Sequence, residues 1–427
     1  MTSARKFGFP PLLTDGLFTI AYLYFFGMLL NEAEVGQSTR SYYKLVVLLI
    51  MAATVVVALA FGDWPGFKRI MRENLVLLAF LGLALFSCLW STMPDQTVAY
   101  GMELVLPAAC GLAASTQLDM NRHLRVLTAA LLIISISSVV VCLLIPSIGV
   151  MHEHFPGAWR GVFPHKNKLG RIMSFGILCG LFGVLRGRHL MASVTLTVLS
   201  LVLVLMSRSK TALLLALCLC PVVLLLRLLQ RRPHAFRVFL GLLVVVAGIA
   251  ILWELNRGTV LSGMHDVAKA GATMIGKSLA LTGRDVIWRA CTDLAWERPL
   301  LGYGYEGFWG QYGPSGWIRE VIGGPQVRAD NSYIELWLEL GLAGVVLFGL
   351  MLAEFCRRGF RHLLKVSEWV AIWPLICFLF IVICAITEQI FITTPEQAWF
   401  VIIIWGCNLC VPCQTDLSDA RTNECKI

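Results

Sequence analysis

Charged side chains are scarce in this sequence. Asp, Glu, Lys and Arg make up only 14% of the 427 residues, whereas 58% are hydrophobic and the mean hydropathy is +0.76. A soluble globular domain is about half apolar and about one quarter charged. The shortage of charge therefore excludes a water-soluble protein and indicates a chain that lies mostly within a lipid bilayer.

Cysteine and histidine are missing from the places where they would form cross-links or metal sites. Although the chain has 14 cysteines, Cys291 alone lies in the long hydrophilic loop, which excludes a disulfide within that loop. Cys407, Cys410 and Cys413 have no histidine or second cysteine pair to complete a zinc site, and the HEH at residues 152–154 has no further ligand at suitable spacing. We therefore predict no metal and no cofactor.

Apolar runs fill most of the chain instead. Their length of about 20 residues is what an α-helix needs to cross a bilayer core of about 30 Å. We predict an all-α polytopic membrane protein with about 12 transmembrane helices and no removable signal peptide. The expected spans are Leu17–Leu30, Tyr43–Phe61, Asn74–Trp90, Val98–Ser115, Leu124–Ile145, Leu169–Leu185, Leu190–Met206, Thr211–Leu229, Phe236–Trp253, Tyr333–Phe355, Trp369–Phe391 and Gln397–Val411.

The distribution of Lys and Arg predicts the topology. Two expected outer loops, Ser91–Thr97 and Glu388–Glu396, contain neither residue, whereas the loops on the other side are rich in both. Because cytoplasmic loops carry an excess of Lys and Arg, both termini are expected in the cytoplasm. The chain then divides into residues 1–253 with the first nine helices, a large outer loop at 254–331, and residues 332–427 with three helices and a cytoplasmic tail.

Three outer segments break this charge rule. They are Trp159–Arg171, Ser207–Thr211 and the long loop from Glu254 to Asn331. Long loops cross a membrane regardless of their charge, which accounts for the third segment but not for the short second one. The alternative interpretation, which we favour, is that these cations converge on an anion at the outer leaflet.

The long outer loop has features of a working surface. A loop of this length is rarely a passive connector. Apolar Ile287, Cys291 and Leu294 recur at helical spacing, so we predict an amphipathic helix over residues 285–298 that Pro299 ends. We expect this helix to lie on the membrane face or across the mouth of the helix bundle.

An aromatic and glycine-rich stretch, GYGYEGFW, follows that helix. Tyr303 and Tyr305 within it are candidates for substrate contact by stacking on sugar rings, or alternatively for anchoring at the membrane interface. Where the chain re-enters the membrane, Glu335 and Glu339 stand at or just inside the edge. A carboxylate is costly there unless it is paired or functional.

Four blocks of sequence carry a resemblance to a known family. They read RGVFPHKNKLGR, SRSKTALLLAL, LTGRDVIW with the later ERPLLGYGYEGFW, and DNSYIELWLELGLAG, and in this order they lie within residues 160–347. Together they resemble the O-antigen ligase and polysaccharide polymerase superfamily, including ExoQ-like exopolysaccharide polymerases. The resemblance implies a GT-C-like membrane glycosyltransferase that takes a glycan from undecaprenyl pyrophosphate and joins its reducing end to an acceptor hydroxyl, without a nucleotide sugar or metal.

The resemblance also implies a setting. The protein would lie in a bacterial inner (cytoplasmic) membrane and bind an undecaprenyl-pyrophosphate-linked oligosaccharide at the outer, periplasmic face. Chain-length regulators and export proteins are further candidate partners, besides the lipid bilayer itself, and no nucleic acid is expected.

The loop exit departs from the family pattern. Family ligases carry a histidine there, followed by a polar residue and two spaced small residues. Asn331, Gly341 and Gly344 match that pattern here, but Asp330 stands at the histidine position. This departure favours a polymerase over a ligase that acts on lipid A core.

The family arginines that bind pyrophosphate match Arg160, Arg208 and Arg284 here. Arginine suits this role because its planar fork pairs with phosphate oxygens bidentately and keeps its charge. Lys166 and Lys210 are additional candidates for the same anion. For each single cation, surface solvation or binding of lipid head groups is an alternative role.

An acceptor hydroxyl needs a positioned general base, because its own pKa is high. Asp330 is the first candidate, although an aspartate at this position could equally cap the following helix. His165 is the alternative base, and Asn167 and Asn331 are further candidate contacts to substrate.

Two other functions stay open beside polymerisation of lipid-linked repeat units. One is a ligase that moves the finished glycan to lipid A core or another acceptor. The other is a transporter of lipid-linked glycans, which would show repeated halves with helices broken at matching positions. The sequence has no such repeat, and its outer cations lie in loops rather than at mid-membrane.

Overall fold

The computed structural model describes residues 11–25, 64–117, 119–152, 155–231, 284–309, 313–316, 328–365, 368–386, 388–391 and 397–409. Within these ranges the regular structure is helical, and one isolated antiparallel bridge joins Val150 to Trp159. The predicted all-α class is thus confirmed for the described part of the chain.

The described helices overlap most of the predicted apolar runs. They are α1 (Pro11–Phe25), α3 (Trp64–Glu73), α4 (Leu75–Phe86), α5 (Pro94–Gln117), α6 (Met120–Leu144), α7 (Pro146–Gly149), α8 (Lys166–Arg186), α9 (Leu190–Ser207), α10 (Lys210–Arg231), α12 (Arg284–Glu297), α14 (Ser332–Lys365), α15 (Trp373–Cys384) and α16 (Gln397–Asn408), with short 3-10 turns η1 (Ser87–Leu89) and η2 (Trp369–Ile372).

Six of the described helices are long and apolar enough to cross a membrane, or seven if the bent pair α3 and α4 is one span. The protein is therefore a multi-pass membrane protein. Two predicted spans, Tyr43–Phe61 and Phe236–Trp253, lie outside the described residues, and α1, α15 and α16 are shorter than a full span. The count of twelve spans and the orientation of the termini stay predictions.

Small residues bring α8 and α9 into close contact. A Cβ atom added at Gly176 would lie 2.4 Å from Oγ of Ser200, and one added at Gly180 would lie 2.8 Å from the carbonyl oxygen of Ser193. Small side chains at such interfaces let helix backbones approach closely inside a membrane, where packing rather than hydrophobic transfer drives association. Helices α6 and α10 pack on this pair, and α1 packs on α6.

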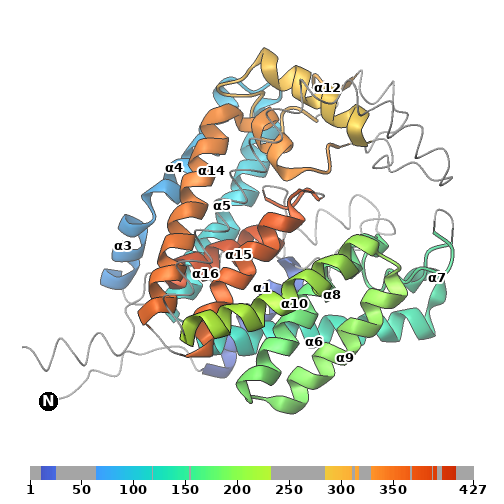
Figure 1. Cartoon of the computed structure of the whole chain (residues 1–427). Coiled ribbons are helices and arrows are strands. Elements are labelled where there is room, and N and C mark those ends of the chain that lie inside the picture. The colour runs from blue at the N-terminus through green and yellow to red at the C-terminus, as the bar shows by residue number, and fades with distance from the viewer. Residues whose placement is uncertain are drawn as a thin grey trace, which may run out of the picture.

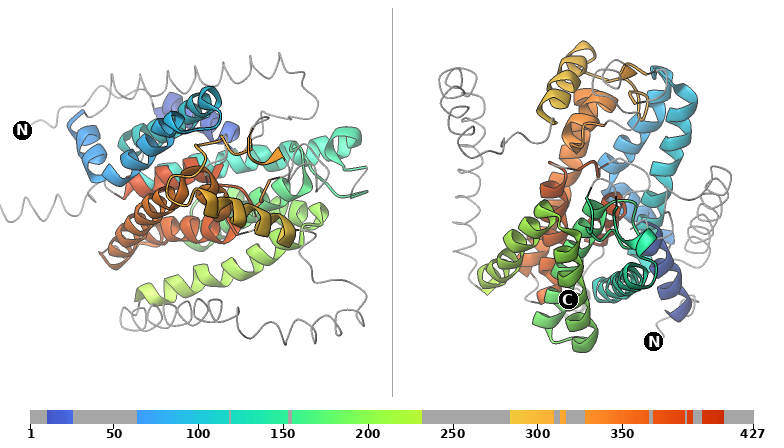
Figure 2. Two further views of the ribbon diagram at one scale, coloured as in Figure 1. Left: turned by 90° about the horizontal axis from the view of Figure 1, so that it is seen from above. Right: turned by 90° about the vertical axis from the view of Figure 1, so that its right-hand side faces the viewer.

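A second group of helices contains α4, α5, α14 and α16 (Figure 1). Helix α15 lies between the two groups, and its Trp373 ring lies 5.6 Å from the Phe175 ring and 5.1 Å from the Phe182 ring of α8. The right-hand view in Figure 2 places α12 at one end of the second group, next to the start of α14. The aromatic contact thus holds the two groups together.

Helix α14 is not the single regular helix that the sequence predicts. The backbone breaks at Gly341, where φ is 64° and ψ is −167°. The segment at residues 299–304 fits into this break. The N–H groups of Tyr303 and Gly304 donate to the carbonyls of Leu338 and Glu339 at 2.9 Å, and those of Leu342 and Ala343 donate to Pro299 and Leu300 at 2.8 and 3.1 Å. The loop therefore satisfies the backbone groups that the break releases.

We predict that Gly341→Ala destabilises the protein by about 2 kcal/mol or more, because this backbone conformation is nearly restricted to glycine. The new Cβ would also lie 2.3 Å from the carbonyl carbon of Leu300. Thermal unfolding of the purified protein in detergent measures the effect. Gly349→Ala, in the same helix with nothing within 4 Å of the added Cβ, is the control and should leave the melting temperature nearly unchanged. Equal melting temperatures for the two variants would contradict the prediction.

Candidate functional site

Two of the three predicted basic segments meet at one corner of the molecule. The N–H of Trp159 donates to the carbonyl of Met206 at 3.0 Å, and Nζ of Lys166 donates to the carbonyl of Arg208 at 3.3 Å. The segment before α8 and the turn between α9 and α10 therefore lie together. We call the corner that contains Arg160, His165–Lys168 and Arg208–Lys210 the basic corner.

Backbone carbonyls anchor the two arginines of the basic corner. Nε of Arg160 donates to the carbonyl of Ile148 at 2.6 Å, and Nη1 of Arg208 donates to that of Pro156 at 3.2 Å. A carbonyl acceptor fixes a guanidinium in place without removing its charge. Arg208 also ends α9 in a left-handed conformation, with φ of 51°, so its side chain leaves the turn in a defined direction. The two charges are thus held in place before any ligand arrives.

The start of α8 completes the basic corner. His165 is its N-cap, and Nδ1 of that ring accepts a hydrogen bond from the N–H of Asn167 at 3.2 Å. Lys166 is buried, with its ammonium 4.0 Å from the centre of the Phe155 ring, whereas Lys210 is exposed at the start of α10. The dipole of a helix N-terminus favours anions. The corner can therefore hold a phosphate-like anion.

An ion pair joins α8, the helix that begins at the basic corner, to the exit of the long loop. Arg171 of α8 is buried, and its Nη1 lies 3.2 Å from Oε2 of Glu388. Oγ of Ser332, the first residue of α14, donates to the carbonyl of Glu388 at 2.8 Å. Glu388 therefore connects two predicted blocks that are far apart in the sequence. Sequence reasoning missed this residue, and only the lack of Lys and Arg in its loop singled that loop out.

Asn331, rather than Asp330, caps α14. Oδ1 of Asn331 accepts from the N–H groups of Tyr333 and Ile334 at 3.0 and 3.2 Å. Asp330 stands one residue earlier and is half-buried, with a positive φ of 48° that non-glycine residues seldom adopt. The alternative in which Asp330 caps the helix is thus replaced by a cap one residue later.

A polar clamp holds the segment that carries Asp330. Glu335 is fully buried and accepts hydrogen bonds from the N–H of Ala329 at 2.8 Å and from the indole N–H of Trp309. On the other side, the indole N–H of Trp288 donates to the carbonyl of Ala329 at 2.7 Å. Both polar groups of the Ala329 backbone are therefore fixed. This accounts for Glu335, one of the two costly carboxylates that the sequence places at the membrane edge.

Arg328 adds a charge pair to this clamp. Its Nη2 lies 2.9 Å from Oε2 of Glu306, a residue of the GYGYEGFW stretch. Burial alone would lower the pKa of Arg328, but the charges of Glu306 and Glu335 outweigh that effect and raise the pKa above its ordinary value. The guanidinium thus stays charged. Neither Arg328 nor Glu306 was singled out from sequence, because no local pattern pairs them.

The tyrosines of the GYGYEGFW stretch belong to the protein core. Tyr303 is 3% exposed, and its hydroxyl lies 3.0 Å from the carbonyl of Leu294 and 2.9 Å from Oε2 of Glu297. Burial, followed by the nearby Glu297 carboxylate, raises the pKa of Tyr303 to about 12. Tyr305 is fully buried, and its carbonyl accepts from Oγ1 of Thr97 at 2.8 Å. The structure thus packs both rings inside instead of presenting them to a sugar or to the membrane interface.

The amphipathic helix predicted in the long loop is confirmed as α12. It ends at Glu297, two residues before Pro299, and its apolar face packs on α14 through Cys291, Ala295 and Leu338. Arg284 is its first residue, but its side chain lies outside what the structure describes. That the third basic segment also reaches the basic corner therefore stays a prediction.

In the described part of the chain, no group of three or more His, Cys, Asp or Glu side chains has the arrangement of a metal site. Glu153, His154, Cys410 and Cys413 lie outside the described residues.

Comparison with known proteins gives this geometry a context. Residues 195–349 match the O-antigen ligase family. The chain is also similar to the exopolysaccharide production protein ExoQ of Rhizobium meliloti (strain 1021), with 26% identity over 366 residues that cover 82% of this chain and 77% of ExoQ. The predicted resemblance to this family is confirmed. The O-antigen ligase match begins in α9 and ends in α14, so it contains the α9–α10 turn, α12 and the clamp around Asp330.

We predict that Arg328→Met lowers the free energy of unfolding by about 2 kcal/mol, because it leaves the buried Glu306 carboxylate without its cation. Since Arg328 is partly exposed, the effect is smaller than for a fully buried ion pair. Thermal unfolding of the purified protein measures this. Arg328→Met combined with Glu306→Gln should recover part of the loss, since the unpaired charge is then removed. A single variant as stable as the wild type would refute the pairing.

Proposed function

We propose that this membrane enzyme of the O-antigen ligase and ExoQ type polymerises undecaprenyl-pyrophosphate-linked oligosaccharide repeat units at the periplasmic face of a bacterial inner membrane. The observation that carries the proposal is the contact chain from Arg171 through Glu388 to Ser332, which joins the basic corner to the clamped Asp330 segment. An anion site and a carboxylate thus belong to one connected region, as transfer from a pyrophosphate carrier to a hydroxyl requires.

In this proposal the basic corner binds the pyrophosphate of the donor. Arg160 and Arg208 pair with its oxygens, Arg284 of the long loop completes the set, and Lys166 and Lys210 add positive charge. Fixed cations aimed at the charge that grows on a leaving group lower the barrier because they need no reorganisation during the reaction. The cations supply the charge stabilisation, so the proposed reaction needs no metal.

The acceptor is the sugar hydroxyl of a second lipid-linked chain. Its oxygen attacks the anomeric carbon of the donor glycan, the bond from that carbon to the phosphate oxygen breaks, and the electron pair leaves with undecaprenyl pyrophosphate. Asp330 accepts the hydroxyl proton, with His165 as the alternative base. Direct attack inverts the configuration at the anomeric carbon. Asn331 caps the start of α14 beside this base, and His165 caps the start of α8. Asn167, next to His165, is a further candidate contact to the substrate.

Two observations favour a polymerase over a ligase. Asp330 occupies the position at which the resembling ligases carry histidine. The similar protein ExoQ is named for exopolysaccharide production, which agrees with chain elongation rather than attachment to lipid A core. Chain-length regulators and export proteins remain candidate partners. Ligation is the second candidate function, because the matched family is named for it.

We predict that Arg160→Gln and Arg208→Gln each lower the rate of polymerisation by about 100-fold or more, the usual effect of removing one preorganised group that stabilises developing charge. Gel analysis of surface glycan in a deletion strain carrying each variant measures the loss of long chains. Arg188→Gln, an exposed arginine in the turn at the other end of α8, is the matched control and should give normal chains. Glycan chains of normal length in both variants would contradict the proposed role of Arg160 and Arg208 in pyrophosphate binding.

We predict that Asp330→Asn abolishes most activity, by about 100-fold or more, because an amide cannot accept the hydroxyl proton. The fold should persist, since Asn331 provides the cap of α14. The same chain-length analysis, combined with a melting temperature close to that of the wild type, measures this. Full activity of Asp330→Asn would exclude it as the base and shift the assignment to His165.

The glycan left in the deletion strain separates the two candidate functions. Loss of long chains with single repeat units retained on the carrier lipid indicates a polymerase. Long chains that accumulate on the carrier lipid and never reach the final acceptor indicate a ligase.

A further inference from the structure

Helix α3 is a short amphipathic helix at the end of the bundle opposite α12 (Figure 1). Ile70 on its inner face is 1% exposed and packs in the main core, whereas Arg69 and Arg72 on the outer face are exposed. The sequence predicts only a loop rich in Lys and Arg here, and the structure shows a helix instead. It packs on α4 and α5 through its apolar side. Its cations therefore point away from the protein.

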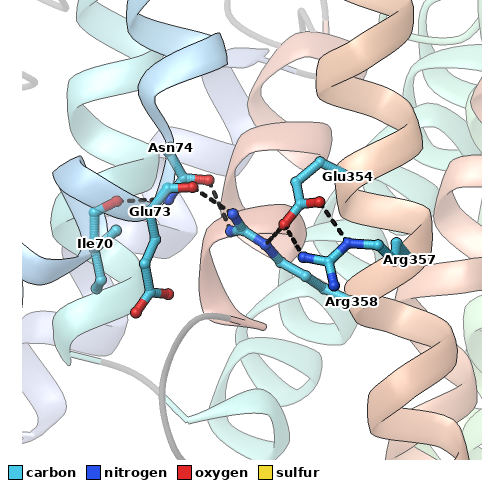
Figure 3. Close-up of polar contacts among 6 residues, drawn as sticks. All are labelled: Ile70, Glu73, Asn74, Glu354, Arg357 and Arg358. Atoms are coloured by element: carbon cyan, nitrogen blue, oxygen red, sulfur yellow. Dashed lines mark hydrogen bonds and ion pairs between the residues drawn. The ribbon is translucent and has the colours of Figure 1, made fainter.

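A network of polar contacts fixes the corner between α3 and α4. Figure 3 shows Nδ2 of Asn74 donating to the carbonyl of Ile70, at 2.7 Å, and Nη1 of Arg358 donating to Oδ1 of Asn74, at 3.0 Å. Nη2 of Arg358 also donates to the carbonyl of Glu73. The last carbonyls of α3 are thus satisfied by side chains, and a cation at a helix C-terminus is favourable in itself. These contacts hold the corner between α3 and α4 in a defined conformation.

Glu354 holds the arginine that makes this corner. Its carboxylate accepts from Nε of Arg358 at 2.7 Å and from Nε of Arg357 at 2.6 Å, so the end of α14 is tied to the end of α3 (Figure 3). The axes of α3 and α4 differ in direction by 76°. If α4 crosses the membrane, α3 must run nearly parallel to the membrane surface.

The same end of the bundle marks the level of the membrane edge. Leu75, the first residue of α4, is 63% exposed and needs lipid around it, whereas Arg72 and Arg69 precede it by only three and six residues. On α14 the exposed cations Arg361 and Lys365 follow at this end. Exposed cations next to exposed apolar surface, on a helix lying along the surface, suit the head-group layer of a bilayer.

We infer that α3 is a binding site for anionic phospholipid head groups, with Arg69 and Arg72 as its ligands. Arginine forks pair with the phosphate of a lipid head group, while the apolar start of α4 takes the acyl chain. A free phosphate would gain only the first of these contacts, so the site selects the lipid. This site lies at the opposite end of the helix bundle from the basic corner and is independent of the proposed reaction.

The test compares the full chain with the variant Arg69→Gln/Arg72→Gln. Each protein is purified in detergent, offered phosphatidylglycerol or phosphatidylcholine, and examined by native mass spectrometry for retained lipid. We expect the variant to bind phosphatidylglycerol about tenfold more weakly than the wild type, with no change for phosphatidylcholine. Arg69→Lys/Arg72→Lys should restore most of the binding, which excludes a folding defect as the cause. Inorganic phosphate should not compete at millimolar concentration.

The matched control removes the same charge elsewhere. Arg125→Gln/Arg188→Gln neutralises two exposed arginines of α6 and the α8–α9 turn, and it should keep most of the lipid. Equal retention by the α3 variant and the wild type would overturn the inference. So would an equal loss in the control, which would mean that net charge alone attracts the lipid. Competition by inorganic phosphate would overturn the selectivity for lipid.

Discussion

The backbone hydrogen bonds between residues 299–304 and the break in α14 are the contact on which the candidate site depends. A helix that breaks inside a membrane protein exposes N–H and C=O groups that lipid cannot satisfy. Here the loop supplies partners on both sides of Gly341, from Tyr303 N–H to Leu338 and from Leu342 N–H to Pro299, each within 2.9 Å. The break and the loop therefore stabilise each other, and neither is expected to keep its conformation alone.

This mutual dependence sets the position of the chemical groups. Because the loop is seated in α14, Glu306 can meet Arg328, and Trp309 can reach Glu335. These contacts hold the backbone that carries Asp330. The ion pair between Arg171 and Glu388 then ties this end of α14 to α8, where the basic corner begins. A buried ion pair of this kind adds little net stability, but it fixes the relative position of the two segments.

At both ends of the bundle, a carboxylate pairs with an arginine that helps to fix the backbone. Near the loop, the buried Glu306 carboxylate pairs with Arg328, which directly precedes the segment that carries Asp330. At the α3 corner, Glu354 holds Arg358, and that arginine satisfies the end of a helix whose outer face is basic. In both places a paired charge holds a backbone segment in position, because an unpaired charge or carbonyl would be costly in a low-dielectric environment. The cations of the basic corner and of α3 are the ones that we propose bind anions.

The sequence by itself determined the membrane class, the positions of most helices, the amphipathic α12 and the family resemblance, because these depend on local periodicity, run length and short motifs. It also singled out the segments of the basic corner by their unusual charge. Only the tertiary structure decided the break at Gly341, the cap at Asn331 rather than Asp330, the burial of Tyr303 and Tyr305, and the pairing of Arg171 with Glu388 across a separation of 217 residues. Most of these features depend on partners distant in sequence, and a local pattern carries no information about which distant group will satisfy a buried charge or a free backbone amide.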